Sequence, residues 1–370
     1  MSTYAELDVT PIINANATLT RLGGSLMPPE VLEAMMEAAK VFVELPELQR
    51  RVGNRIALLT QNEACYVSSG AAGGIVVAIA ACVTGNDMAA IERLPDLTGL
   101  RDEVIVHKSQ RNGYDHAVRQ VGVKLVEIGY PAVTEVWQLE GAINEKTAAV
   151  IWFHGALGGP GDISLEKVID ISHAHGVPVL VDAAAQLPPV ENLWKFTQLG
   201  ADAAIFSGGK DLRGPQSSGL VLGRQWLIDA CARNGPPNHS IGRPMKVGKE
   251  EMLGLLAAVE RYLALDHEGR ASQMDEIVTG WCNELSKLDG VRAERSFPNE
   301  AGQPLPRAQV HFDAAVVGRS RGEIVQGLID GRPAVSVAAG PDDSIFLNPT
   351  TLEEGEEEVV LARLVEEVRG

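Results

Sequence analysis

The chain has 370 residues, of which 45% are hydrophobic and 22% are charged. This composition is ordinary for a soluble globular protein and excludes disordered, collagenous and fibrous chains. Lysine and arginine together number 32 against 49 aspartate and glutamate residues, so the net charge is −17. A field of that sign repels phosphate backbones and anionic lipid, so we expect neither nucleic acid nor a membrane as a partner.

The cysteines and the first residues of the chain indicate the compartment. Cys65, Cys82, Cys231 and Cys282 are widely spaced in apolar or helical surroundings. No CxxC pair and no cysteine–histidine spacing typical of a metal site is present, so we expect reduced, buried thiols and no metal. The segment MSTYAELDVT has neither the basic nor the apolar part of a signal peptide. We therefore expect a cytoplasmic protein.

In chain order, the first two thirds of the sequence predict helices and strands in alternation. Pro28 and Pro29 precede a run with apolar residues at helical spacing, so a helix is expected from there through Leu45. A second helix is expected over roughly Glu47 to Thr60, and a third, IVVAIAACV, after the small-residue segment at 68–74. The segments predicted next are strands at 103–107, 124–129, 148–153, 177–182, 201–207 and 218–223, and helices at 113–122 and 164–176.

The order of these segments predicts the fold class and the domains. Several strands are continuous apolar runs, which suits strands buried on both faces. Alternating β and α segments imply a mainly parallel sheet with right-handed crossovers. After about residue 248 the pattern changes to helices and antiparallel strands, as in a compact α+β domain. We predict an N-terminal arm at 1–27, a large α/β domain at 28–250 and a small C-terminal domain at 251–370.

Three segments carry the candidate chemistry, because ligands of open parallel sheets bind beyond the carboxyl ends of the strands. The first is SSGAAGG at 68–74, between a short apolar stretch and a helix. Small residues let backbone amides approach an anion, and the helix N-terminus adds positive potential. The segment matches neither the GxGxxG nor the Walker A spacing. By itself it is therefore compatible with phosphate binding or with mere tight packing.

The other two segments place a charged residue after an apolar strand. Asp182 closes VPVLVD, where a carboxylate is costly to bury unless a positive group such as a protonated pyridine nitrogen meets it. Helix capping and metal binding are the alternatives for this aspartate. Lys210 lies among glycines after ADAAIF, which suits an amine that forms a Schiff base, although an exposed turn lysine is also possible. A phosphate loop, an acid and a lysine in this order are jointly best explained by pyridoxal 5'-phosphate.

Several stretches of the chain resemble a known family. These are INANATLTRLGGSLMPPEVLEAM, RVGNRIALLTQNEACYVSSGAAGG, VDAAAQLPP, FSGGKDLRGPQSSGLVLG and RPMKVGKEEMLGLLAAVERYL. They resemble the selenocysteine-synthase-like branch of fold-type I pyridoxal phosphate-dependent enzymes, which includes L-seryl-tRNA selenium transferase and D-glucosaminate-6-phosphate ammonia-lyase. The resemblance covers most of residues 10–265. It implies the fold-type I transferase fold, with a pyridoxal phosphate-binding large domain and a smaller α+β domain.

The resemblance also implies roles for particular residues at the cofactor. Lys210 would form the Schiff base with the cofactor aldehyde, and Asp182 would pair with the pyridine nitrogen. The phosphate donors would be Ser69, Gly70, Ala71 and Ser207. The segment GPQSSG at 214–219, which contains Gln216 and Ser217, would help at the phosphate across a dimer interface. A homodimer or larger homo-oligomer is therefore expected.

Two further cofactor contacts are expected. Gln186 would reach the phenolic oxygen of the cofactor, although it follows Asp182 by four positions and the usual offset in related desulfurases is three. A residue that stacks on the cofactor ring should come from 107–118, where Tyr114 and Asn112 are the candidates and the sequence does not select between them.

Basic residues in apolar or glycine-rich surroundings are candidates for binding a substrate anion. They are Arg21, Arg213, Arg243 and Lys246, with Arg243 as the first choice. Ion pairing at an interface or on the surface is the alternative for each of them.

We predict a pyridoxal phosphate-dependent lyase that acts on a hydroxylated amino acid. Lys210 would remove the Cα proton, a β-hydroxyl would leave as water, and hydrolysis would give a 2-keto acid and ammonia. By resemblance, the substrate would be similar to D-glucosaminate 6-phosphate. Racemase, aldolase and aminotransferase reactions begin in the same way and are alternatives.

Two other functions are alternatives for this sequence. Selenium transfer to seryl-tRNA is disfavoured, because the chain has a net charge of −17 and no basic arm. A catalytically silent regulator on the same fold is the non-enzyme alternative, and the presence of Lys210 and Asp182 counts against it.

Overall fold

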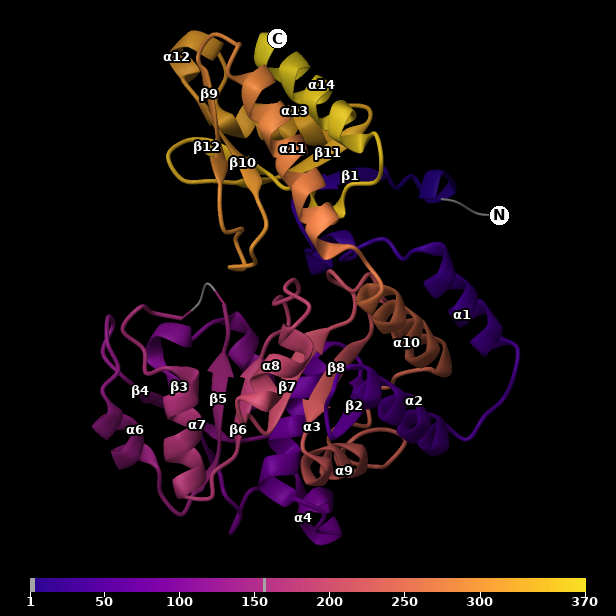
Figure 1. Cartoon of the computed structure of the whole chain (residues 1–370), viewed down its shortest axis with the longest axis vertical. Helices are drawn as coiled ribbons and strands as arrows, with labels where there is room; N and C mark the ends of the chain where they lie inside the picture. The colour runs from indigo at the N-terminus through magenta and orange to yellow at the C-terminus, as the bar shows by residue number, and fades with distance from the viewer. Residues whose placement is uncertain (1–3, 156–157) are drawn as a thin grey trace. The chain divides into compact units, whose positions relative to one another are not determined.

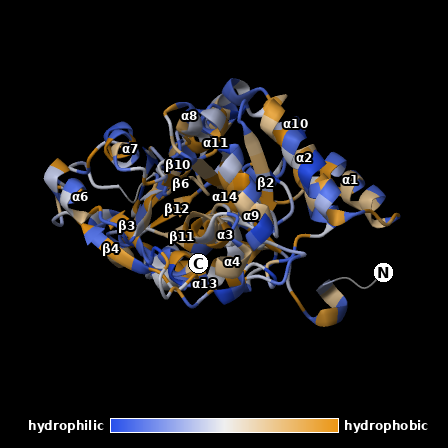
Figure 2. Cartoon of the chain, turned by 90° about the horizontal axis from the view of Figure 1, so that it is seen from below, coloured by the Kyte–Doolittle hydropathy of each residue, from blue (hydrophilic) through white to orange (hydrophobic). Residues whose placement is uncertain are grey.

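The computed structural model describes residues 4–155 and 158–370, which form two compact units (Figure 1). The larger unit spans Met27–Leu265, and the smaller unit combines the chain up to Leu26 with Asp266–Gly370. The larger unit thus continues past residue 250, where the sequence predicts the domain boundary. Its last helix, α10 (Lys249–Leu263), packs against α1 (Pro29–Ala39) and α2 (Leu45–Leu59), and the three lie side by side in Figures 1 and 2.

The larger unit is built on a seven-stranded sheet with the strand order β2-β8-β7-β6-β5-β3-β4. Its strands are β2 (Ala64–Ser68), β3 (Glu103–His107), β4 (Lys124–Ile128), β5 (Thr147–Phe153), β6 (Val179–Asp182), β7 (Ala203–Ser207) and β8 (Gly219–Gly223). Only β8 runs antiparallel to its neighbours, β2 and β7. The carboxyl ends of the other six strands therefore share one edge of the sheet, as the alternating sequence pattern predicts.

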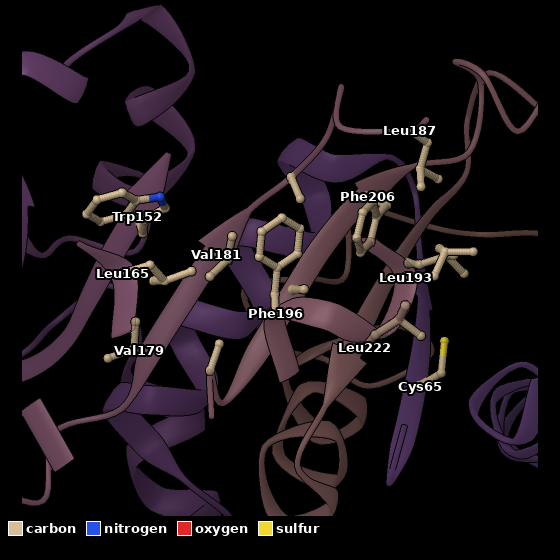
Figure 3. Packing of buried hydrophobic residues seen from close by; sticks show 14 of the residues in the cluster. Cys65, Trp152, Leu165, Val179, Val181, Leu187, Leu193, Phe196, Phe206 and Leu222 are labelled. Carbon is tan, nitrogen blue, oxygen red and sulfur yellow. The ribbon is translucent and has the colours of Figure 1, made fainter. Parts of the chain in front are cut away.

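Helices cover both faces of this sheet. Successive residues of each strand point to opposite sides, so the apolar strands present hydrophobic side chains on both faces. Trp152, Val181 and Phe206 face one helical layer (Figure 3), and their neighbours in the strands face the other. The first layer contains α2, α7 (Leu165–Ala174), α8 (Asn192–Gln198) and α10. The second contains α3 (Ala71–Thr84), α5 (His116–Arg119) and α9 (Gln225–Asn234). Two short helices, α4 (Met88–Arg93) and α6 (Val136–Ala142), complete the unit.

One predicted helix is shorter than the sequence pattern suggests. Helix α1 ends at Ala39, not at Leu45, and the connection to α2 exposes Val41, Phe42 and Val43. Pro46 lies in the first turn of α2. Proline is tolerated there but not inside a helix, because it lacks an N–H and its ring clashes with the preceding turn. The chain therefore does not run from α1 into α2 as one helix, and the apolar residues between the two helices form an exposed loop.

The smaller unit is an α+β structure around a five-stranded sheet of order β1-β11-β12-β10-β9. Its strands are β1 (Ile12–Ala15), β9 (Val291–Ser296), β10 (Arg307–Phe312), β11 (Ala334–Ala339) and β12 (Ser344–Leu347), and its helices are α11 (His267–Leu285), α12 (Ala314–Val317), α13 (Arg321–Asp330) and α14 (Glu356–Arg369). The N-terminal segment supplies β1, which pairs in parallel with β11. Within the described residues, no helix combines the length and the apolar character needed to span a bilayer.

Gly53 lies where α2 packs closely against the sheet. A Cβ atom at this position would lie 2.2 Å from the carbonyl oxygen of Cys65 in β2. Alanine favours helices over glycine by about 1 kcal/mol, but here the clash should dominate. We expect Gly53→Ala to lower the free energy of unfolding by about 1–3 kcal/mol, measured by chemical denaturation.

The matched control is Gly141→Ala in α6 of the same unit, where a Cβ atom would meet nothing within 4 Å. This variant should leave the stability unchanged or raise it by up to about 1 kcal/mol. Equal changes in the free energy of unfolding for the two variants would show that close packing at Gly53 does not determine the effect of the added methyl group.

Candidate functional site

The predicted cofactor segments meet at the carboxyl edge of the large sheet. In the strand pairing, Gly219 at the start of β8 lies opposite Ser68 at the end of β2 and opposite Ser207 at the end of β7. Asp182 ends β6, the strand beside β7. Residues far apart in the sequence are thus brought to neighbouring positions by the sheet.

The small-residue loop forms the start of α3, a helix of 14 residues. Gly70 is its N-cap and has a φ of 108°, a backbone conformation that favours glycine. Ser69, Gly70 and Ala71 are half-buried, so their amide groups lie near the surface of this edge. Gly219 passes so close that a Cβ atom there would lie 2.6 Å from the carbonyl carbon of Gly70. Only a residue without a side chain lets β8 and this loop approach in this way.

Asp182 is a buried carboxylate at the same edge. Burial raises its pKa, while the backbone N–H of Ala184 and the nearby amine of Lys210 act in the opposite direction. The Ala184 amide donates to Oδ1 of Asp182 at 3.0 Å. The amine of Lys210 is thus within electrostatic range of this carboxylate. A positive group beside Asp182 would offset the cost of burying its charge.

Lys210 lies in a turn that follows β7. The amide of Gly208 donates to the carbonyl of Ser218 at 2.8 Å, and the amide of Gly214 donates to the carbonyl of Gly208 at 2.8 Å. The amide of Arg213 donates to the carbonyl of Lys210 at 2.9 Å and closes the turn. Arg213 has a φ of 56°, a conformation that costs strain in a residue with a side chain. The lysine is thus half-buried on a backbone that is held on both sides.

The remaining basic candidates divide between the two units. Arg243 and Lys246 lie in a loop beside α3: the sulfur of Met245 in this loop is 3.8 Å from where a Cβ of Gly73 would lie. Arg243 is half-buried and Lys246 is exposed. Arg213 belongs to the lysine turn. Arg21 is an exposed residue of a short 3₁₀-helix, Thr20–Leu22, in the smaller unit.

The other predicted cofactor residues take different positions. Gln186 is buried, and its main-chain carbonyl accepts a hydrogen bond from the side-chain amide of Asn192 at 2.7 Å. Gln216 and Ser217 are exposed.

The two candidates for ring stacking lie in a turn after β3. Tyr114 is 68% exposed. The side chain of Asn112 accepts from the Tyr114 amide at 2.7 Å and donates to the Gln110 carbonyl at 2.8 Å, so it organises this turn. The choice between the two residues stays open.

The structure also brings to this edge groups to which the sequence analysis assigns no role. The amide of His154, directly after β5, donates to the carbonyl of Asp182 at 2.9 Å. Asp211, directly after Lys210, is buried and accepts a hydrogen bond from the hydroxyl of Tyr262 at 2.8 Å. An acid between Lys210 and the apolar Leu212 was a visible signal for Asp211, but nothing in the sequence indicates Tyr262 as its partner.

Comparison with known proteins identifies the family. The family model for L-seryl-tRNA selenium transferase (SelA) matches residues 12–288. The chain belongs to this family. It is also 33% identical to D-glucosaminate-6-phosphate ammonia lyase of Salmonella typhimurium, over 98% of this chain and 97% of that enzyme. It is equally 33% identical to 5'-C-glycyluridine monooxygenase-decarboxylase of a Streptomyces species, over 98% of this chain and 91% of that enzyme.

A solved structure supports the fold. The structure of a D-glucosaminate-6-phosphate ammonia-lyase covers 100% of this chain and 98% of its own, with 32% identity and a TM-score of 0.87. Structures with lower identity share the fold-type I architecture of pyridoxal phosphate-dependent enzymes. The predicted SelA-like family and the predicted fold are therefore confirmed. The predicted lyase class agrees with the first of the relatives.

The pKa of Asp182 leads to a test in protein freed of any cofactor. Because folding raises the pKa of this group above its ordinary value of 3.8, the folded chain holds the proton more tightly than the unfolded chain. The cost of the buried charge is thus absent well below pH 3.8 and appears as the pH rises through the folded pKa. We expect Asp182→Asn to raise the melting temperature at neutral pH by roughly a few degrees.

Thermal unfolding of the wild type and the variant between pH 4 and pH 8 measures this effect. The difference between the two proteins should shrink toward the acid end of the range. A variant that is less stable than the wild type at neutral pH would contradict this account of the carboxylate.

Proposed function

We propose that this SelA-family chain is a pyridoxal 5'-phosphate-dependent ammonia-lyase that acts on a hydroxylated amino acid. The observation that carries the proposal is the buried carboxylate of Asp182 within the electrostatic reach of the Lys210 amine. The site residues fit this cofactor on physical grounds. A buried acid of raised pKa calls for a positive partner, and the half-buried start of α3 presents amide donors beside Gly219.

Each group has a defined role in the proposed site. Asp182 would hold a proton on the ring nitrogen of the cofactor, and the amides of Ser69, Gly70 and Ala71, with the hydroxyl of Ser207, would bind the phosphate. When bound, the cofactor supplies a covalent link to the substrate nitrogen and an electron sink for a carbanion. The amine of Lys210 would attach the cofactor and then take the proton from Cα of the substrate.

The substrate of the first relative suggests which substrate class to test. Its name specifies an amino acid that carries hydroxyls and a phosphate. Arg243 and Lys246 lie in the loop whose Met245 is beside the start of α3. We propose that these two residues bind the anionic end of such a substrate, with Arg213 of the lysine turn. Elimination of a β-hydroxyl as water and hydrolysis would release a 2-keto acid and ammonia.

Lys210→Ala tests the proposed function. The variant should lose the visible absorption band of the covalent lysine–cofactor link and about 10³-fold of the turnover, because both the link and the proton transfer depend on the Lys210 amine. Turnover is measured as release of 2-keto acid and ammonia from D- and L-hydroxy amino acids, with and without a phosphate group. Phosphorylated substrates should give the higher kcat/KM.

Lys167→Ala is the control, since Lys167 is an exposed lysine on α7. It should retain both the absorption and the turnover. A variant at Lys210 that keeps both would refute the assignment. A wild type that consumes oxygen and releases carbon dioxide instead of ammonia would favour the chemistry of the second relative, and a wild type without visible absorption would favour a non-enzyme.

We also propose that the protein forms a homodimer through the loop between α1 and α2. Phe42 is fully exposed, and Val41, Val43 and Met36 of α1 expose large apolar side chains beside it. An apolar patch of this kind is typical of an interface. A second copy is the proposed occupant, because Gln216, which lies against Gly209 of the lysine turn, and Ser217 are exposed and would be available to a neighbouring subunit.

Phe42→Ser should therefore weaken the dimer. We expect light scattering after size exclusion to give a dimer for the wild type and an increased monomer fraction for the variant at micromolar concentration. Leu58→Ser on α2, at a residue that is 73% exposed and outside this loop, is the control. A wild type that is monomeric at all concentrations would exclude the proposed interface.

A further inference from the structure

Two successive residues of the lysine turn lie in different surroundings. Lys210 is half-buried at the carboxyl edge of the sheet, near Asp182. Asp211 is only 4% exposed, and its Oδ2 atom accepts a hydrogen bond from the hydroxyl of Tyr262 at 2.8 Å. Tyr262 belongs to α10 and is among the largest fully buried side chains of the protein. A buried polar pair therefore joins the lysine turn to a helix of the outer layer.

A carboxylate is unusual at the buried position 211 if the side chain only fills space. A buried charge costs free energy that hydrogen bonds must offset, and apolar residues of similar size often replace buried pairs without loss of stability. The ring of Tyr262 belongs to the same buried hydrophobic cluster as Leu212, Leu255 and Val259. The pair fixes the position of residue 211 relative to α10, since a hydrogen bond between two buried groups holds them in one relative position.

The pair adds a polar restraint to the lysine turn on the side of α10, where Leu255 already packs near Gly208 and Gly214. On one side, the hydrogen bonds of Gly208 with Ser218 and Gly214 tie the turn to the segment that leads into β8. On the other side, Asp211 ties it to Tyr262 on α10. Helix α10 itself packs firmly against α1 and α2. The backbone of Lys210 is thus held between two elements that are separated in the sequence.

We propose that the Tyr262–Asp211 hydrogen bond is a positioning pair for Lys210, which sets where the lysine amine can reach. The inference rests on the proposed function, in which Lys210 attaches the cofactor. Neither Tyr262 nor Asp211 needs to touch the cofactor or the substrate for this role. Loss of the hydrogen bond should loosen the turn and displace the amine from the geometry needed for attachment and proton transfer, where small errors in position are costly.

The test uses the full chain and Tyr262→Phe, which removes one oxygen and keeps the buried ring. We expect the dissociation constant of pyridoxal 5'-phosphate, measured by fluorescence titration of the cofactor-free chain, to rise by up to about tenfold, because the free energy of this hydrogen bond limits how much can be coupled to binding. We expect kcat to fall by a similar factor with little change in KM. Asp211→Ala should behave in the same way, and the double variant should be no worse than Asp211→Ala.

Two further variants separate positioning from general stability. Asp211→Asn keeps an oxygen that accepts from the Tyr262 hydroxyl, so it should retain cofactor affinity within about twofold. Tyr66→Phe is the matched control: Tyr66 is 2% exposed, lies on β2 of the same unit, and has its hydroxyl against Gly235, away from the lysine turn. It should lower the melting temperature without changing the dissociation constant.

The outcomes decide between the two roles. If Tyr262→Phe and Asp211→Ala lose thermal stability but keep the dissociation constant and kcat of the wild type at a temperature where all are folded, the pair is merely structural and the inference is wrong. A rise in KM at unchanged kcat would also overturn it. If the wild-type chain binds no pyridoxal 5'-phosphate, the proposed function fails, and the inference fails with it.

Discussion

The burial of one negative charge at the edge of a sheet is the constraint on which the site depends. Asp182 ends a strand that is buried on both faces, and burial raises the pKa of its carboxyl group. The amine of Lys210 and the amide of Ala184 offset part of this cost. A positively charged ligand beside Asp182 would offset more of it, so the same feature that lowers the stability of the empty chain would favour binding of a protonated ring nitrogen.

The sheet brings the partners of this charge together. Because β8 runs antiparallel between β2 and β7, the start of β8 lies beside the ends of both neighbours. Gly219 then meets the backbone of Gly70 at a separation that no side chain would allow. The small-residue loop at 68–74, the lysine turn and the aspartate consequently lie at one edge of the sheet, and their relative positions follow from strand pairing more than from the loops themselves.

Membership of the SelA family leaves the reaction to be decided by details of this edge. Two relatives, an ammonia lyase and a monooxygenase-decarboxylase, are equally identical to this chain over nearly its whole length. Their names specify different reactions. Overall identity and family membership therefore do not distinguish between these two reactions. We propose that the Asp211–Tyr262 contact, which places the lysine amine, and the loop of Arg243, which would bind the substrate anion, help to decide between such reactions.

The sequence by itself determined the alternation of strands and helices and the residues that carry charge at strand ends, because these depend on local apolar runs and on the residue types at their limits. Asp182, Lys210 and the small residues at 68–74 were recognisable in this way. The tertiary structure alone decided that the N-terminal segment adds β1 to the smaller unit, that α10 belongs to the larger unit, and that Tyr262 meets Asp211. These contacts join residues that lie far apart in the chain, and their formation depends on packing and burial that no local pattern encodes.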